Sequence, residues 1–329
     1  MPKVVRFHST GSADVLKLEE LPAEQPKYGE VRIGVAAIGL NRAEVMFRKG
    51  LYLEQPTFPS PIGYEASGVI DAIGPGVTDF KIGDRVSTIP AFSMTKYGTY
   101  GEEIVVPASA VARYPEHLTP EEGTSIWMQY LTAWGGLVYF GKMKPEDFVV
   151  ITAASSSVGL AAIEIVKAEG AKSIAVTRGS AKKNALLQAG ADIVIVTNEE
   201  NLPARVREIT SGKGFQIAFD PITGKMLGLL AEAAGAEALI IEYGALAGEP
   251  TAFPLFPVLA KGLSVRGYTL FEFTHRPEKL KDGIQYVYGQ LKTGKFRPKI
   301  AKTFKLAEIV EAHRYMESNE QIGKIVVTV

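Results

Sequence analysis

The chain has 329 residues, 46% hydrophobic and 22% charged, a composition typical of a folded protein with enough length for two domains. Lysine plus arginine equals aspartate plus glutamate at 36 each, and no apolar run reaches the length of a membrane span or a signal-peptide core, so neither nucleic acid nor a membrane is an expected partner. The chain has no cysteine, which excludes disulfides, thiolate catalysis and cysteine-bound zinc and fits a cytoplasmic location.

The first part of the chain, to about residue 120, is predicted to be rich in β-strands. Its short apolar runs are separated by Gly-Pro, Gly-Asp and Pro-Ser turn signals, a pattern typical of many short strands. The clearest runs are VRIGVAAIGL (31–40), SGVIDAIG (67–74) and GDRVSTI (83–89). Helical periodicity is scarce in this region.

After residue 120 the pattern changes to strands that alternate with helices. Short runs rich in valine and isoleucine are separated by helical segments, and these runs are FVVIT (148–152), SIAVT (173–177), DIVIV (192–196), QIAFD (216–220) and ALIIEY (238–243). The alternation predicts βαβ units around a parallel sheet. The predicted fold is therefore α/β, with a Rossmann-type doubly wound parallel sheet in residues 123–265. Residues 1–122 and 266–329 are predicted to form one discontinuous, β-rich domain.

The junction AASSSVG (153–159) follows the first strand of the predicted sheet and has the layout of a dinucleotide-binding turn. Ala153, Ser156 and Gly159 stand where such a turn usually has glycines, which allow the backbone to approach a phosphate closely. The free N–H groups and the positive end of the next helix can then bind the anion. Small residues are common at such junctions, so the loop alone is consistent with cofactor binding or with a plain tight corner.

The end of the next strand, VTRGSAKK, indicates which dinucleotide binds. An NAD-selective site usually has Asp or Glu roughly 20 residues after the glycine motif, where it binds the ribose hydroxyls. Here Arg178 takes that place, with Ser180 and Lys182 nearby, and no acidic residue occurs before Asp192. Cations at a helix start oppose the helix dipole, so a bound 2′-phosphate explains them better than a solvated basic surface does. We therefore expect NADPH as the cofactor.

A series of modestly specific segments runs in a fixed order over essentially the whole chain. They are GLNRAEVMFRKGLY (39–52), PSPIGYEASGVIDAIGPGV (59–77), FKIGDRV (80–86), WMQYLTAWGGL (127–137), AASSSVG (153–159), FDPITG (219–224), YGALAG (243–248) and IGKIVV (322–327). In this order they resemble the zinc-independent quinone oxidoreductase branch of the medium-chain dehydrogenase/reductase superfamily, which includes zeta-crystallin-like proteins.

The resemblance implies a GroES-like catalytic domain beside the Rossmann domain, and an enzyme that transfers hydride from NADPH to a quinone or an α,β-unsaturated carbonyl. It also implies a homodimer in which GLSVRGYTLF (262–271) pairs with its copy. Two other functions stay open: an enoyl-thioester reductase, and an NADPH-binding, crystallin-like protein without catalysis.

The residues at the metal-binding positions of the zinc-containing relatives differ here. Those enzymes hold a catalytic metal with a cysteine and the histidine of a GHE motif, and this chain has Asn41 and Tyr64 at these places. The four histidines are scattered and lack ligand spacing, so no metal is expected. A conjugated acceptor is already activated, and it needs only hydrogen-bond donors for its developing charge and a proton source.

The resemblance assigns roles to individual residues, each with a simpler alternative. Asn41, Tyr52 and Tyr64 are the predicted catalytic residues, although Asn41 could merely cap the next helix and the tyrosines could be packing aromatics. The remaining predicted residues bind the cofactor: Thr132, Ser155, Ser156, Ser157, Val158, Gly159, Thr177, Arg178, Ser180, Lys182, Tyr243, Gly244, Ala245, Phe271 and Lys324.

Overall fold

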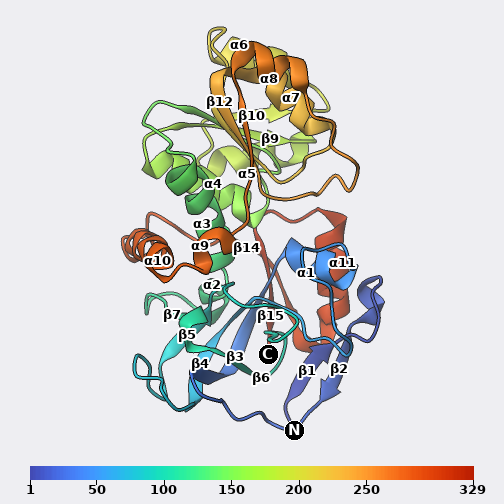
Figure 1. The fold of residues 1–329 in the computed structure, drawn as a ribbon, viewed down its shortest axis with the longest axis vertical. Coiled ribbons are helices and arrows are strands. Elements are labelled where there is room, and N and C mark those ends of the chain that lie inside the picture. The colour runs from blue at the N-terminus through green and yellow to red at the C-terminus, as the bar shows by residue number, and fades with distance from the viewer. The chain divides into compact units, whose positions relative to one another are not determined.

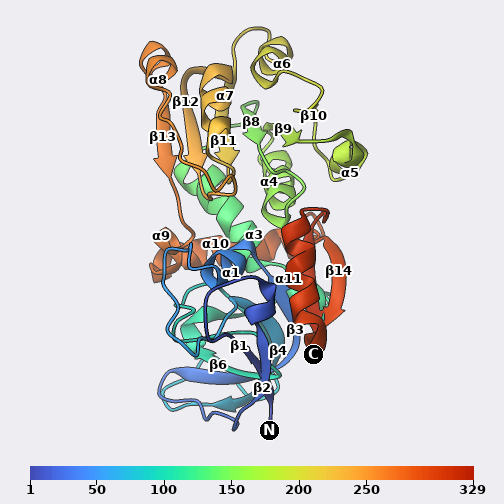
Figure 2. The ribbon, with the colours of Figure 1, turned by 90° about the vertical axis from the view of Figure 1, so that its right-hand side faces the viewer.

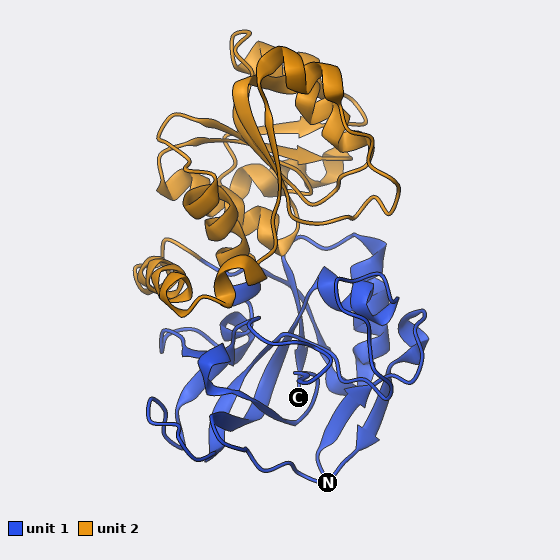
Figure 3. Cartoon of the chain, in the orientation of Figure 1, with its two compact units in different colours: residues 1–128, 297–329 blue, residues 129–296 orange.

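The computed structural model describes residues 1–329, which form two compact units (Figures 1 and 3). Unit 1 comprises Met1–Met128 and Arg297–Val329, and unit 2 comprises Gln129–Phe296. Residues 266–296, which the sequence analysis groups with the β-rich domain, pack in unit 2. The reason is close helix packing: a Cβ placed on Gly283 would lie 2.9 Å from Leu131 and 3.0 Å from Trp134. None of the helices is both long enough and apolar enough to cross a membrane.

Unit 2 is built around a six-stranded parallel sheet in the order β10-β9-β8-β11-β12-β13, which Figure 2 shows side by side. The strands are β8 (Phe148–Ile151), β9 (Lys172–Thr177), β10 (Ile193–Val196), β11 (Phe215–Asp220), β12 (Ala234–Glu242) and β13 (Ser264–Gly267). Renumbered within the unit, this order is 3-2-1-4-5-6, the order of a Rossmann fold. The predicted fold class is confirmed.

Helices connect the strands of unit 2 and cover both faces of the sheet. They are α3 (Trp127–Trp134), which begins in unit 1, α4 (Ser157–Ala168), α5 (Lys183–Gln188), α6 (Leu202–Ile209), α7 (Lys225–Ala233), α8 (Leu255–Lys261), α9 (Phe271–Thr274) and α10 (Pro277–Lys292). Two helical turns join them: a π-helical turn η3 (Gly135–Phe140) and a 3₁₀ turn η4 (Ser180–Lys182).

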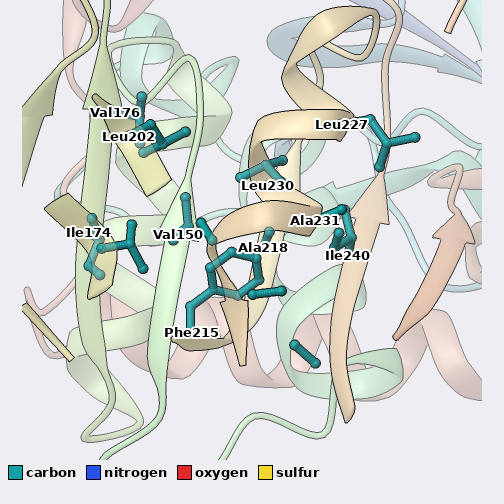
Figure 4. Close-up of a cluster of buried hydrophobic side chains, with 14 of the residues drawn as sticks. Val150, Ile174, Val176, Leu202, Phe215, Ala218, Leu227, Leu230, Ala231 and Ile240 are labelled. Carbon is teal, nitrogen blue, oxygen red and sulfur yellow. The ribbon is translucent and has the colours of Figure 1, made fainter. Parts of the chain in front are cut away.

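A buried apolar cluster fixes one face of this sheet (Figure 4). Val150, Ala218 and Ile240 come from neighbouring strands and pack against Leu202 of α6 and Leu230 of α7. Alternate residues of a strand point to opposite faces of the sheet. One set of side chains therefore packs against α6 and α7, and the other set points to the opposite face, which α4 covers. The same packing sets the register at which the strands end, and so aligns the loops at their carboxyl edge.

Unit 1 is a seven-stranded sheet in the order β14-β15-β3-β4-β5-β7, with β6 also paired to β3. The pairs are antiparallel except β14–β15, and a separate antiparallel pair joins β1 and β2. The strands are β1 (Lys3–Arg6), β2 (Lys17–Glu20), β3 (Glu30–Leu40), β4 (Glu65–Ile73), β5 (Arg85–Thr88), β6 (Glu103–Pro107), β7 (Val111–Arg113), β14 (Ile300–Lys305) and β15 (Lys324–Thr328).

The helical elements of unit 1 are short. They are η1 (Ala13–Val15), α1 (Arg42–Arg48), η2 (Ala108–Ala110), α2 (Pro120–Gly123), η5 (Leu306–Glu308) and α11 (Ile309–Ser318). Helix α1 carries Glu44, which belongs to the site described below, and α11 packs against α1. The strand β15 pairs with β3 so that Ile325 lies opposite Leu40. This pairing brings the last residues of the chain beside the start of α1.

Candidate functional site

The loop between β8 and α4 has the geometry of a phosphate-binding turn. Ala153 has φ +45°, in the left-handed region that residues with side chains rarely adopt. Ser156 caps α4, because its Oγ accepts a hydrogen bond of 3.0 Å from the backbone N of Gly159. A Cβ on Gly159 would lie 2.6 Å from the Cα of Ala154, so only glycine fits there. The tight turn brings the first N–H groups of α4 to the carboxyl edge of the sheet, where they can bind an anion.

Basic and hydroxyl side chains lie beside this loop. The Nζ of Lys182 donates a 3.2 Å hydrogen bond to the Oγ of Ser155, which joins the loop after β9 to the loop after β8. Arg178 and Ser180 are exposed, and Thr177 is the buried last residue of β9. The residues present therefore fit a phosphorylated ribose, because the Lys182 ammonium is bound to the loop before α4 and Arg178 and Ser180 belong to the same segment after β9.

The predicted residues after β12 lie at the same carboxyl edge of the sheet. The backbone N of Tyr243 donates to the carbonyl of Asp220 at 2.9 Å, and the ring of Tyr243 stacks on Phe219 with centroids 3.9 Å apart. A Cβ on Gly244 would lie 2.9 Å from the carbonyl oxygen of Pro221, while Ala245 is exposed. The loop is thus held close to the neighbouring strand end and presents its backbone at the edge where α/β sheets bind ligands.

The other four predicted cofactor residues of unit 2 lie on its helices, and two of them, Ser157 and Val158, are the first residues of α4. Thr132 is buried on α3, with 6% of its surface exposed. Phe271 begins α9 and stacks on His275 with ring centroids 5.2 Å apart. The burial of Thr132 and the ring contact of Phe271 do not identify a ligand, so the cofactor roles of both residues stay predictions.

Glu242, at the end of β12, is a functional candidate that the sequence analysis missed. It lies directly opposite Asp220 in the parallel ladder, and both of its carboxyl oxygens are buried without a hydrogen-bond partner. Burial, and then the neighbouring Asp220 carboxyl, raise the pKa of Glu242, which favours the neutral form of its carboxyl group. The signal was the acidic residue at the end of an otherwise apolar run, ALIIE.

Unit 1 contains a buried polar cluster, here called the Lys324 cluster, formed by Asn41, Glu44, Glu65 and Lys324. The Nζ of Lys324 donates to the Oε2 of Glu65 and to the Oδ1 of Asn41, each at 2.5 Å. The Nδ2 of Asn41 donates to Glu65 at 3.2 Å and to Glu44 at 3.1 Å. Asn41 and Lys324 are 283 residues apart in the sequence, and they meet because β15 pairs with β3.

Glu44 was also missed by the sequence analysis, although the spacing Asn-x-x-Glu was visible. Asn41 is the N-cap of α1, as its alternative role predicts, and its backbone N donates to the Oε2 of Glu44 at 2.5 Å. The backbone N of Tyr64 also donates to Glu44, at 3.2 Å. Burial raises the pKa of Glu44 to about 7, despite the opposing effect of the nearby Lys324 ammonium.

The Lys324 cluster does not fit a zinc ion. The resemblance places Asn41 at a metal-ligand position, and both ends of its amide are engaged by Lys324, Glu44 and Glu65. A fixed ammonium group beside the position repels a divalent cation. Tyr64 supplies a phenol whose pKa is raised far above its usual value by burial, in place of an imidazole. No group of three or more His, Cys, Asp or Glu side chains is arranged to hold a metal ion.

Tyr52 and Tyr64 lie together in unit 1, with ring centroids 6.5 Å apart in an edge-on arrangement. Tyr64 is fully buried and Tyr52 is half-buried. Burial raises the pKa of Tyr52 to about 12, and the hydrogen bond between the two phenols partly opposes this rise. Both phenols therefore keep their protons at neutral pH, as a proton donor must.

The structure thus joins the predicted residues in three groups. In unit 2 it brings Ser155 beside Lys182, and in unit 1 it brings Asn41 beside Lys324 and Tyr52 beside Tyr64. Lys324 was predicted to bind the cofactor, and its buried ammonium is engaged by Asn41 and Glu65; the cofactor role stays a prediction.

Comparison with known protein families identifies both halves of the chain. Residues 27–116 match the alcohol dehydrogenase GroES-like domain, and residues 157–286 match the zinc-binding dehydrogenase family. The chain therefore belongs to the medium-chain dehydrogenase/reductase superfamily, in which many relatives are quinone oxidoreductases. The predicted family and the GroES-like domain are confirmed.

Curated relatives match along the whole chain. A quinone oxidoreductase of Pseudomonas aeruginosa is 29% identical over 99% of both chains. The human quinone oxidoreductase is 30% identical over 94% of this chain and 92% of its own. A 2-haloacrylate reductase of a Burkholderia species is 29% identical over 97% of both chains.

Solved structures agree with this assignment. Escherichia coli quinone oxidoreductase, solved in complex with NADPH, superposes with a TM-score of 0.93 and 27% identity over 99% of this chain and 100% of its own. A mycobacterial protein, also solved with NADPH, has a TM-score of 0.91 and 27% identity over 99% of this chain and 100% of its own. Both structures support the NADPH expected from Arg178 and its neighbours.

Proposed function

We propose that this chain is an NADPH-dependent oxidoreductase that reduces a quinone or an α,β-unsaturated carbonyl without a metal. The observation that carries the proposal is the phosphate loop of unit 2, where Lys182 is hydrogen-bonded to Ser155 beside the exposed Arg178. Relatives named quinone oxidoreductase, and the neighbours solved with NADPH, support the cofactor and the reaction class.

The cofactor residues divide by the part of NADPH that they bind. The N–H groups at the start of α4, with Ser155, Ser156 and Ser157, hold the pyrophosphate. Arg178, Ser180 and Lys182 hold the 2′-phosphate. The backbone of Tyr243, Gly244 and Ala245 holds the nicotinamide half, and Thr132, Phe271 and Lys324 keep their predicted supporting roles. When bound, the cofactor supplies a hydride, and the chain supplies orientation and a proton.

The acceptor is proposed to be a small apolar carbonyl compound or quinone. The 2-haloacrylate reductase among the relatives favours the α,β-unsaturated carbonyl. We assign the proton donor to Tyr52, because it is half-buried and its phenol stays protonated at neutral pH. Asn41 is proposed to act by holding Lys324 and Glu65 in place, since its amide is already engaged by them. The cysteine-free sequence favours a reducing compartment such as the cytoplasm.

We also propose a homodimer formed through unit 2. The strand β13 is the last strand of its sheet, so its outer edge is unpaired within the chain. The nearby helix α8 exposes Leu255 (50%), Phe256 (80%) and Leu259 (68%), an apolar surface that is unusual for a monomer. Analytical ultracentrifugation tests this: the wild type should be a dimer and Phe256→Glu a monomer. The control Ile82→Glu, on exposed apolar surface of unit 1, should leave the dimer intact.

The test of the activity is loss of reduced-nicotinamide absorbance, with NADPH and NADH each offered an ortho-quinone and an open-chain enone. NADPH-selective consumption with either acceptor is the expected result. The better acceptor then decides between the quinone and the enone as substrate class. Tight NADPH binding with no consumption would instead support a non-catalytic, crystallin-like protein, and turnover of enoyl thioesters alone would support the thioester reductase.

A further inference from the structure

A line of hydrogen bonds leads from the buried tyrosines of unit 1 to a half-buried carboxylate. The hydroxyl of Tyr64 donates to the Oε1 of Glu54 at 3.4 Å, and the hydroxyl of Ser93 donates to the other oxygen, Oε2. Because Ser93 has one proton and gives it to Glu54, the 2.7 Å contact between Ser93 and Thr95 must be donated by Thr95. All donors therefore point toward Glu54, which is the common acceptor.

Exposure increases along this line. Tyr64 is fully buried, whereas Glu54, Ser93 and Thr95 are each half-buried. Leu53, next to Glu54 in the sequence, is 71% exposed. Tyr64 therefore has no direct contact with solvent, and Glu54 lies where the line approaches the surface.

The negative charge of Glu54 also acts on the tyrosines. After burial, Glu54 is among the causes that raise the pKa of Tyr52 and of Tyr64, together with Glu44 on α1. Glu44 and Glu54 are the charged groups that these phenols face. A tyrosinate left behind by proton donation is therefore strongly disfavoured, and a donor in this position needs a rapid source of a replacement proton.

We propose that Glu54 is the proton-relay residue that connects the Tyr52–Tyr64 pair to solvent; this inference rests on the proposed function. Hydride addition to the β-carbon of an enone produces an enolate. Tyr52 gives its O–H proton to the α-carbon of the enolate, Tyr64 gives its proton to the oxygen of Tyr52, and the Glu54 carboxylate takes a proton from a solvent hydronium ion and passes it to the oxygen of Tyr64. Glu54 is then a carboxylate again, so one solvent proton has reached the product and both phenols are restored.

The chemistry of the two acceptors supplies an internal control. Hydride addition to a quinone gives a hydroquinone anion, whose oxygen exchanges protons with water without a catalyst. Protonation of an enolate at carbon is slower and benefits from a positioned acid. Loss of the relay should therefore affect the enone and spare the quinone.

The experiment compares the wild type with Glu54→Gln, Glu54→Asp and the exposed control Glu20→Gln, with NADPH and each acceptor. Glu54→Gln cannot carry a proton but can still accept a hydrogen bond, so kcat for the enone should fall about tenfold or more with little change in KM. Glu54→Asp should recover part of the loss, and Glu20→Gln should stay within about twofold of the wild type. Equal enone kcat in the wild type and Glu54→Gln would overturn the relay.

A second measurement does not depend on catalysis. Tyrosinate absorbance followed to alkaline pH should show the titration of Tyr52 moving to lower pH in Glu54→Gln, because a negative charge near the phenols is removed, and Tyr52→Phe identifies that transition. An unchanged titration means that Glu54 is not coupled to the phenols, which overturns the relay even if the enzyme is active. If the wild type oxidises NADPH with neither acceptor, the proposed function fails and the relay fails with it.

Discussion

In unit 2 some of the predicted cofactor residues are exposed at the ends of the strands, whereas in unit 1 the polar groups of the Lys324 cluster are buried and bind one another. Arg178 and Ser180 are exposed, but Asn41 and Lys324 are buried at 7% and 1% exposure. The difference shows two uses of polar side chains in one chain: exposed groups in unit 2 are available to a ligand, and the buried groups of Asn41, Glu65 and Lys324 already bind one another.

The largest expected effect comes from breaking the Lys324 cluster. Lys324→Ala leaves Glu65 buried without its cation, which should lower the free energy of unfolding by about 3–5 kcal/mol. Urea denaturation measures this, with the exposed Lys17→Ala as the control that should change little. The double variant Lys324→Ala/Glu65→Gln should lose less than the sum of the single losses, because the two groups interact directly. Additive losses would mean that the pair is not coupled.

The pH dependence of stability is the next effect in size. The pKa of Glu44 is about 7 in the folded chain against an ordinary 4.5, so between these values the folded state holds a proton that the unfolded state has lost. The free energy of unfolding should therefore fall by roughly 3 kcal/mol as pH rises from the unfolded to the folded pKa. Glu44→Gln should lack this part of the decline. Parallel stability curves for the two proteins would contradict the assignment.

Cofactor selectivity tests the exposed cofactor residues that are predicted in unit 2. Arg178→Asp replaces a cation beside the predicted 2′-phosphate site with an anion, and one charge-assisted hydrogen bond contributes about 1.5–3 kcal/mol. The NADPH-to-NADH affinity ratio should fall roughly ten- to hundredfold, measured by fluorescence titration. Lys167→Asp makes the same charge change at the exposed far end of α4 and should leave the ratio intact. An unaltered ratio in Arg178→Asp would rule out this account of the 2′-phosphate.

The smallest effect concerns the cap of α4. Ser156→Ala removes the hydroxyl that accepts from Gly159 and should cost about 1 kcal/mol of stability, while Ser156→Gly should cost only a few tenths. Thermal unfolding distinguishes the two variants. If Ser156 also binds the pyrophosphate, both variants should lose NADPH affinity to a similar degree although their stabilities differ. Unchanged affinity in both would restrict Ser156 to capping.

The sequence by itself determined the features that depend on local pattern. Strand–helix alternation predicted the parallel sheet, because buried strands and connecting helices have different hydrophobic periods. The small residues of 153–159 predicted the turn, since Gly159 leaves no room for a side chain beside Ala154. Arg178 followed by Ser180 and Lys182 predicted NADPH from charge alone.

Only the tertiary structure decided which distant residues meet. Lys324 reaches Asn41 because β15 pairs with β3, and a strand register is set by packing over the whole sheet rather than by nearby sequence. The elevated pKa values of Glu44 and Glu242 likewise depend on burial and on neighbours that no local pattern shows. Glu54 illustrates the same limit: its sequence neighbours mark it as a loop residue, and only the fold places its carboxylate between Tyr64 and Ser93.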